Sequence, residues 1–184
     1  MQQAKSMLAK QKVSRLPDSK KRAARNKKRT TASTKPSVTL QYRLRTADDD
    51  AYILQLTRQE LGETHARAFG EPFPEQNFLR YIQSGAPTYL IEQGGNKMGY
   101  YSYLIGPDQK MHISALVIEP KWQSAGLGRS VMDQLEGVAK SHSVKVMEVF
   151  VQDNNARSLE FTKSLGFQEV YRFPPNTICF QKQI

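Results

Sequence analysis

The fold of this chain is constrained most by a short junction at residues 119–130, which reads EPKWQSAGLGRS. An apolar run precedes the junction, and an amphipathic pattern typical of a helix follows it from about Gly128. The first amides of such a helix lack partners within the helix, and Gly126 and Gly128 let a ligand approach the backbone closely. With the positive end of the helix dipole and the charge of Arg129, the junction predicts a strand-to-helix turn that binds phosphate oxygens.

Two common phosphate-binding motifs are absent from this junction. It lacks the Gly-Lys-Ser/Thr ending of a P-loop, which excludes a P-loop NTPase. It also lacks a third glycine followed by an acidic residue about 20 positions later, so a dinucleotide-binding fingerprint fits poorly. The identity of the phosphate ligand therefore has to come from the surrounding sequence.

Hydrophobic periodicity divides the rest of the chain into strands and helices. Apolar runs predict strands at residues 39–45, 88–93, 97–106, 110–120, 144–152, 167–173 and 177–183. Helical patterns occur from about Thr46 to Leu61, at residues 65–85 with a break near Pro72 and Pro74, at 128–141 and at about 155–166. We therefore expect a mixed α/β (α+β) fold in which helices pack against a sheet that contains an antiparallel meander.

The net charge of +10 is concentrated near the N-terminus. Residues 1–36 hold 12 Lys or Arg and one acidic residue, whereas the remainder of the chain is close to neutral. Because this segment has few apolar residues and a high density of like charges, we expect residues 1–37 to form a disordered basic tail before a folded domain at residues 38–184. The tail could contact nucleic acid or the ribosome, act as a targeting signal, or serve only as a solubilising extension.

Cysteine content and hydropathy bear on the compartment. Cys179 is the single cysteine, so an intramolecular disulfide is excluded, and one thiol cannot by itself form a zinc site. We therefore expect a reducing, cytoplasmic setting and no bound metal. No apolar run approaches the roughly 20 residues that span a bilayer, and the N-terminus lacks the apolar stretch of a secretory signal, so we expect a soluble protein without a membrane partner.

A longer pattern around the junction resembles a known family. Residues 116–128 follow L-x-I-x-P-x-x-Q-x-x-G-x-G, which resembles the acetyl-CoA signature of the GNAT superfamily of N-acetyltransferases. The segment NARSLEFTKSLGF at residues 155–167 resembles that family's downstream helix, which begins at an Asn that contacts the cofactor and ends in Gly-Phe. The order of elements from Thr39 to Gln183 resembles the family as well. The resemblance implies a central mixed, mostly antiparallel sheet with helices on both faces.

The resemblance also implies an acetyl-CoA site. A pyrophosphate loop is expected at Gln123, Ser124, Ala125, Gly126, Leu127, Gly128 and Arg129. The strand end at Leu116, Val117 and Ile118 is expected to pair with the pantetheine arm through its backbone, where the family's sheet splays open. Asn155 is expected to contact the pantetheine region, although Asn is also a good helix N-cap and both roles can hold.

A transferase that acts on an amine needs a base. A lysine amine with a reference pKa near 10.4 is almost fully protonated at neutral pH and cannot attack in that form. His112, on the strand that leads into the junction, is a candidate because histidine titrates near neutral pH. Glu148 on the following strand is a second candidate. Both residues also fit ordinary strand positions without a catalytic part, so the sequence leaves the base unassigned.

The proton donor for the departing CoA thiolate is a second open point. Family members commonly place a Tyr seven residues after the Asn, whereas this chain has Thr162 there. A threonine hydroxyl is a poor proton donor, although a thiol with a reference pKa near 8.5 leaves tolerably well as the thiolate. Tyr171 on the next strand, or water, is the alternative donor.

The expected function is direct transfer of an acetyl group from acetyl-CoA to a primary amine of a small molecule or a protein. The family's acceptor pocket forms from the first helices and the meander, whose aromatic residues either line the site or belong to the core: Phe69, Phe73, Phe78, Tyr101 and Tyr103. The alternative is an acyl-CoA-binding module without catalysis, whose basic tail binds nucleic acid or the ribosome. The chain is expected to be a monomer or a homodimer.

Overall fold

The structure, a computed structural model, describes residues 39–184 of the 184-residue chain. The predicted basic tail at residues 1–37 lies outside the described residues, so the tail and its boundary with the folded domain remain predictions. None of the helices within residues 39–184 combines the length and the apolar character that crossing a membrane requires.

The described chain follows the order of elements that the hydrophobic periodicity predicts. The strands are β1 (Gln41–Leu44), β2 (Thr88–Gln93), β3 (Asn96–Ile105), β4 (Lys110–Ile118), β5 (Val146–Gln152), β6 (Gln168–Phe173) and β7 (Thr177–Gln183). The helices are η1 (Ala47–Asp49), α1 (Asp50–Phe69), α2 (Glu75–Gln83), η2 (Pro120–Trp122), α3 (Leu127–Ser141) and α4 (Ala156–Ser164). The break predicted at Pro72 and Pro74 is the gap between α1 and α2, because proline cannot continue the hydrogen-bond ladder of a helix.

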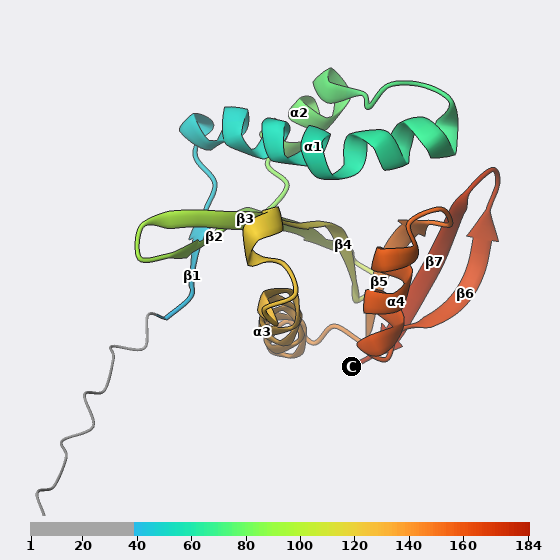
Figure 1. Cartoon of the computed structure of the whole chain (residues 1–184). Helices are drawn as coiled ribbons and strands as arrows, with labels where there is room; N and C mark the ends of the chain where they lie inside the picture. The colour runs from blue at the N-terminus through green and yellow to red at the C-terminus, as the bar shows by residue number, and fades with distance from the viewer. Residues whose placement is uncertain (1–38) are drawn as a thin grey trace, which may run out of the picture. The chain divides into compact units, whose positions relative to one another are not determined.

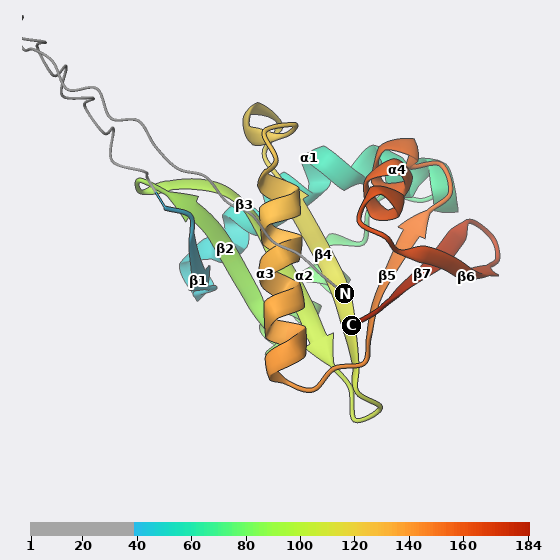
Figure 2. The ribbon, with the colours of Figure 1, turned by 90° about the horizontal axis from the view of Figure 1, so that it is seen from below.

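The strands of the described region form one sheet in the order β1-β2-β3-β4-β5-β7-β6. Neighbouring strands are antiparallel except for β4 and β5, which run parallel with α3 as their crossover connection. α1 and α2 cover one face of the sheet, and α3 and α4 lie on the other (Figures 1 and 2). The predicted mixed α/β class, with a mostly antiparallel sheet and helices on both faces, is therefore confirmed.

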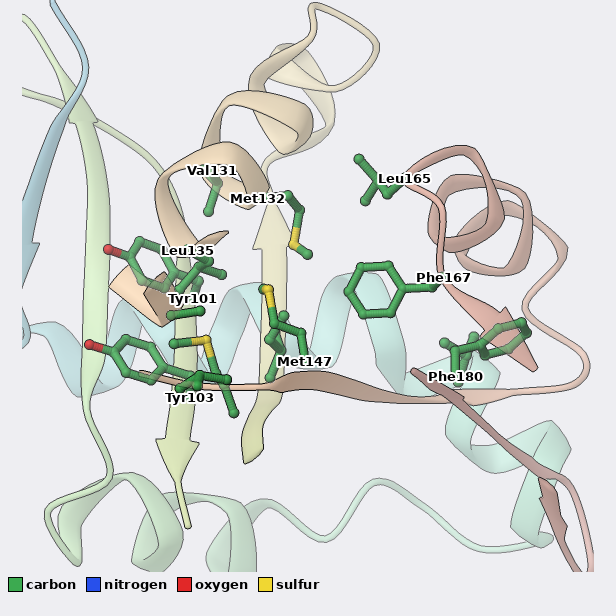
Figure 3. Packing of buried hydrophobic residues seen from close by; sticks show 14 of the residues in the cluster. Tyr101, Tyr103, Val131, Met132, Leu135, Met147, Leu165, Phe167 and Phe180 are labelled. Atoms are coloured by element: carbon green, nitrogen blue, oxygen red, sulfur yellow. The ribbon is translucent and has the colours of Figure 1, made fainter. Parts of the chain in front are cut away.

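The larger apolar core lies between the sheet and α3. Val131, Met132 and Leu135 of α3 are at most 3% exposed and point toward the strands (Figure 3). Their spacing places them on one side of the helix, and burial of each side chain stabilises the fold by roughly 2 kcal/mol. Tyr101 and Tyr103 belong to this core too, so of the two alternatives for these tyrosines, core rather than acceptor pocket is confirmed.

A second core lies between the sheet and the helix pair α1 and α2. Ile53 and Leu56 of α1 belong to one buried cluster with Leu90 of β2 and Tyr100 of β3. The Tyr100 phenol donates to Thr57 Oγ1 at 2.5 Å, because the single hydroxyl proton of Thr57 is donated to the Ile53 carbonyl. α1 is thereby fixed over β3, and its C-terminal half extends toward β5 (Figure 1).

An ion-pair network joins the start of α1 to two strands. The Asp49 carboxylate, whose side chain is 3% exposed, accepts hydrogen bonds from the Arg43 guanidinium of β1 at 2.9 and 3.1 Å. It also accepts from Lys97 Nζ of β3 at 2.7 Å, and from the backbone N–H and hydroxyl of Thr46 at 2.9 and 3.0 Å. The hydrogen bonds from Arg43 are the main reason that the pKa of Asp49 lies well below its usual range.

Candidate active site

β4 and β5 pair over only a short length before they separate. Their parallel register covers residues 110–113 of β4 and 146–149 of β5, and a β-bulge at Ser114 follows directly. Beyond the bulge β4 remains paired with β3 to its end while it diverges from β5 (Figure 2). We call this divergence the fork. The edge of β4 at residues 114–118 has no strand partner on the β5 side among the described strands, so backbone groups on this edge other than the Ile118 carbonyl, which accepts from Gln123, can pair with an extended ligand.

The turn between η2 and α3 presents a helix N-terminus to the fork. Ser124 and Gly126 have φ angles of 64° and 80°, in the left-handed region that favours glycine. Gly126 is the N-cap of α3 and has no side chain with which to cap the helix, so the first N–H groups of α3 can donate to an external acceptor at the positive end of the dipole. The predicted strand-to-helix turn is present, and an anion such as phosphate is the ligand that its geometry favours.

Gly128 is favoured by close packing rather than by its backbone angles. A Cβ atom at this position would lie 3.0 Å from Cζ of Phe161 in α4 and 3.5 Å from Cδ1 of Ile118 in β4. The missing side chain therefore lets α3 approach α4 next to the end of β4. The two glycines of the motif serve different purposes, since Gly126 provides a backbone conformation and Gly128 provides space.

A cavity of about 400 Å³ connects the fork with the N-terminus of α3. Most residues predicted to bind acetyl-CoA line it together, namely Leu116, Val117, Ile118, Gln123, Ser124, Gly126, Gly128, Arg129 and Asn155. Ala125 and Leu127 are not among the lining residues; Ala125 is exposed to solvent, and Leu127 is buried in the core beneath α3. The fold thus brings both sequence motifs to one cavity.

Sequence patterns missed six of the residues that line this cavity: Glu60, Leu61, Thr64, Arg157, Ser158 and Phe161. The first three come from α1, whose position over β4 depends on tertiary packing that no local pattern encodes. Arg157 did carry a signal, because it is a basic residue two positions after Asn155 in the same motif.

Gln123 bridges three elements across the fork. Its Nε2 donates hydrogen bonds to Oε2 of Glu60 in α1 at 2.8 Å and to the Ile118 carbonyl at the end of β4 at 2.5 Å. Its Oε1 accepts a hydrogen bond from the Arg157 guanidinium in α4. The side chain predicted to contact pyrophosphate therefore also ties α1, β4 and α4 together.

Asn155 caps α4 and lines the cavity at the same time. Its Oδ1 accepts a hydrogen bond from the Ser158 N–H at 3.1 Å, which is the N-cap role weighed from the sequence. At the other end of α4, the Arg129 guanidinium donates to the carbonyl and hydroxyl of Ser164 at 3.3 and 3.4 Å. Arg129 and Arg157 are both among the residues that line the cavity, and a guanidinium group is well suited to phosphate.

His112 and Glu148 lie side by side where the fork begins. Met111 and Ile113 point into the core beneath α3, so His112 between them points to the opposite face of the sheet. His112 Nδ1 is 3.9 Å from Glu148 Oε1, and Glu148 Oε2 accepts a hydrogen bond from Gln181 at 2.6 Å. Burial lowers the pKa of His112, and the Glu148 carboxylate opposes this shift, so the imidazole is neutral at neutral pH and can accept a proton. Neither residue is among those that line the cavity.

The two candidate proton donors occupy different surroundings. Thr162 is 7% exposed within α4 and is not among the residues that line the cavity, whereas Ser158 and Phe161 of the same helix are. Tyr171 in β6 forms a hydrogen bond with Cys179, which raises the pKa of Tyr171 to about 12. Its phenol therefore retains its proton at neutral pH, and the choice of donor stays a prediction.

The lining of the cavity suits a ligand with phosphates at one end and an extended arm at the other. The first amides of α3 and the positive charges of Arg129 and Arg157 favour phosphate, while the open edge of β4 offers backbone partners to amide groups. Leu116 and Phe161 add apolar contact. Acetyl-CoA carries these groups in this order, so the residues present fit it. Within residues 39–184, no group of three or more His, Cys, Asp or Glu side chains is arranged to hold a metal ion.

Comparison with known sequences points to the same chemistry. A family model described as "Acetyltransferase (GNAT) family" matches residues 55–167. The N-terminal acetyltransferase B complex catalytic subunit naa20 of Schizosaccharomyces pombe is 36% identical over 109 residues, which cover 55% of this chain and 60% of that protein. The match thus spans less than two thirds of the length of this relative.

Two of the solved structures with a similar fold are named as acetyltransferases. An acetyltransferase from Thermus thermophilus has a TM-score of 0.65 and 20% sequence identity, with 79% of this chain and 97% of that chain covered. The paia N-acetyltransferase from Thermoplasma acidophilum, solved in complex with coenzyme A, has a TM-score of 0.66 and 15% identity, with 79% and 99% covered. At these identities the similarity establishes the fold.

Proposed function

The chain belongs to the GNAT family of acetyltransferases, and we propose on that basis that it transfers an acetyl group from acetyl-CoA to a primary amine. The observation that carries the proposal is the cavity that joins the N-terminus of α3 to the open edge of β4. In this proposal the pyrophosphate is bound by the turn at residues 123–129 and the pantetheine arm lies along residues 116–118, with Asn155 beside it.

The acceptor that we propose is the α-amine at the start of a polypeptide chain. The relative from Schizosaccharomyces pombe is named as the catalytic subunit of an N-terminal acetyltransferase complex, which supports an acceptor of this class. An α-amine has a reference pKa of about 7.7–8.0, so roughly a tenth is neutral at pH 7, against about one molecule in two thousand for a lysine amine. An α-amine therefore places a smaller demand on the enzyme's base.

His112 is the residue to which we assign proton transfer. Its lowered pKa keeps the imidazole neutral at neutral pH, so it can accept the proton that the attacking amine loses. Acetyl-CoA supplies the thioester carbonyl carbon, to which the neutral amine adds and from which the CoA thiolate departs to take up a proton from solvent. Glu148, with Oε1 3.9 Å from His112 Nδ1, stabilises the imidazolium that results.

The test follows release of the CoA thiol from acetyl-CoA in the presence of small amines, lysine peptides, and peptides with a free or a blocked α-amine. Gly126→Glu places a carboxylate at the N-terminus of α3 and should abolish acetyl-CoA binding. Gly95→Glu is the matched control, because Gly95 in the β2–β3 turn has the same φ of +80° and equally open surroundings, but lies outside the cavity lining.

The outcomes separate the candidate functions. Turnover on free α-amines that disappears in Gly126→Glu and persists in Gly95→Glu supports the proposal. Turnover confined to lysine or small amines would support the acetyltransferase activity but refute the α-amine as its acceptor. Acetyl-CoA binding without turnover on any amine would favour the acyl-CoA-binding module, and the basic tail at residues 1–37 would then be the segment to test for nucleic-acid binding.

A further inference from the structure

Three aromatic side chains form a contiguous surface that the proposed mechanism does not use. Phe150 of β5 and Tyr171 and Phe173 of β6, which we call the aromatic platform, have ring centroids 4.7 to 6.5 Å apart. Tyr171 is 39% exposed and Phe173 is 46% exposed. Single exposed apolar residues are common on protein surfaces, but rings in mutual contact form a patch of the kind that marks a binding site.

The aromatic platform lies on the same face of the sheet as the candidate base. Phe150 follows Glu148 by two residues in β5, so both side chains project from one face. The Phe150 ring centroid is 5.1 Å from that of His112. Tyr171 continues this row across β7, because Phe150 and Tyr171 both pair with Cys179. The rings therefore extend the surface from His112 outward along the β6–β7 hairpin.

The position of the aromatic platform relative to the fork is fixed by the tip of this hairpin. Asn176, between β6 and β7, donates a hydrogen bond from Nδ2 to the Ala68 carbonyl in the last turn of α1. The Asn176 carbonyl accepts a hydrogen bond from the Asp153 N–H at 2.9 Å, in the turn after β5. These two contacts join the hairpin to the end of α1 and to the turn after β5, so the rings have a defined place beside His112.

We propose that the aromatic platform selects acceptor chains whose first residue has a large apolar side chain. The inference rests on the proposed function, since it assigns the platform to the residue that carries the reacting α-amine. An α-amine held at His112 has its own side chain on the adjacent carbon, within reach of the ring that lies 5.1 Å from the imidazole.

The side chains that this surface favours follow from its chemistry. Met, Leu and Phe gain from contact with aromatic rings, and the Met sulfur adds a favourable interaction of its own. Ala and Ser are too short to cover the platform. An Asp at the first position would bring its carboxylate toward that of Glu148, a like charge whose side chain is only 13% exposed.

The experiment compares peptides that differ only in their first residue, with the full chain and acetyl-CoA. We expect kcat/KM for Met, Leu or Phe to exceed that for Ala, Ser or Asp by about tenfold, the lower end of what apolar contacts in a site discriminate, because the rings are half-exposed. Phe173→Ala removes the most exposed ring and should reduce the Met-to-Ala ratio to about threefold or less.

A matched control is available on the same strand. Val170, one position before Tyr171, is 51% exposed and is not part of the aromatic platform. Val170→Ala should leave the Met-to-Ala ratio unchanged. Acetyl-CoA affinity should be the same in the parent chain and in both variants, which reports that the cofactor site remains folded.

Several results would overturn the inference. Equal kcat/KM for all first residues would do so, as would a ratio that survives Phe173→Ala. Conversion of a dimer to a monomer by Phe173→Ala, without a change in the ratio, would make the platform a contact between copies of the chain. If no peptide is acetylated, the proposed function fails, and the inference is then tested by the affinities of the CoA-loaded protein for the same peptides. Tighter binding of the Met peptide than of the Ala peptide supports the inference, and equal binding refutes it.

Discussion

Replacing Asp49 with Asn should destabilise the fold by about 3 kcal/mol. The carboxylate accepts five hydrogen bonds, from Arg43, Lys97 and Thr46. In Asn, the NH₂ group would replace one of the two carboxylate oxygens, and it cannot accept the hydrogen bonds that this oxygen accepts. Removing one partner of a buried ion pair costs about 3–5 kcal/mol. The lower end applies here because the side chains of Arg43 and Lys97 are 39% and 35% exposed, so water compensates for part of the loss.

The effect of Asp49→Asn should also depend on pH in a defined direction. Because the native state holds the pKa of Asp49 well below its usual range, the ionised carboxylate stabilises the fold at every pH above the unfolded value of about 3.9. This contribution is lost as the pH falls from there toward the native pKa. The difference in unfolding free energy between parent and variant should therefore be constant from about pH 7 to pH 5 and shrink below about pH 4.

Urea unfolding of the full chain at several pH values measures both the loss of unfolding free energy in Asp49→Asn and its dependence on pH. With an m-value of about 2 kcal/mol/M, a loss of about 3 kcal/mol lowers the midpoint by roughly 1.5 M. Asp48→Asn is the matched control, because Asp48 is the adjacent residue and is exposed, and this change should alter stability by less than about 0.5 kcal/mol. Equal losses in the two variants, or an Asp49→Asn difference that persists undiminished at pH 3, would refute the reasoning.

Two further predictions concern the cavity and its surroundings. His112→Gln should lower kcat by about 100-fold or more and remove the rise of kcat with pH through a pKa below 6.5. His142→Gln, at an exposed position, should leave the dependence of kcat on pH unchanged. A pH dependence like that of the parent in His112→Gln would exclude His112 as the base. Asn155→Ala should cost about 1 kcal/mol of stability through loss of the α4 cap, while Asn155→Asp should keep the cap but weaken acetyl-CoA binding, as thermal unfolding and a binding titration would report. Unchanged affinity in Asn155→Asp would remove this residue from the cofactor site.

The parts of the site that the sequence predicted are those with local physical requirements. A left-handed N-cap at Gly126 favours glycine, and the close approach of Phe161 favours a residue without Cβ at Gly128, so both preferences are visible in one short motif. Asn155 is visible for a similar reason, since it begins a helix. The element order followed from periodicity because most strands have one face buried beneath a helix.

The parts that the sequence did not predict depend on contacts between distant segments. Glu60 reaches the cavity only because α1 lies across β4, and its hydrogen bond with Gln123 joins residues 63 positions apart. The alternation along β5 and β6 predicts strands but does not show which face of the sheet a helix leaves uncovered. The sequence therefore could not predict that the rings of Tyr171 and Phe173 are exposed. Tyr101 and Tyr103 were ambiguous for the same reason.

An open sheet ordinarily has two edges, and the fork adds interior edges where β4 and β5 separate, the longer one on β4. A row of unpaired backbone groups is a template for pairing with strands of other molecules, and proteins usually protect such an edge with charge, proline or a bulge. Here the protection is steric, because Glu60 of α1 and Phe161 of α4 line the same cavity as the end of β4 and enclose it from both faces of the sheet. The fold can therefore keep strand-pairing groups ready for a single slender ligand without offering them to another sheet, and so without the aggregation hazard that an exposed edge of the same length would carry.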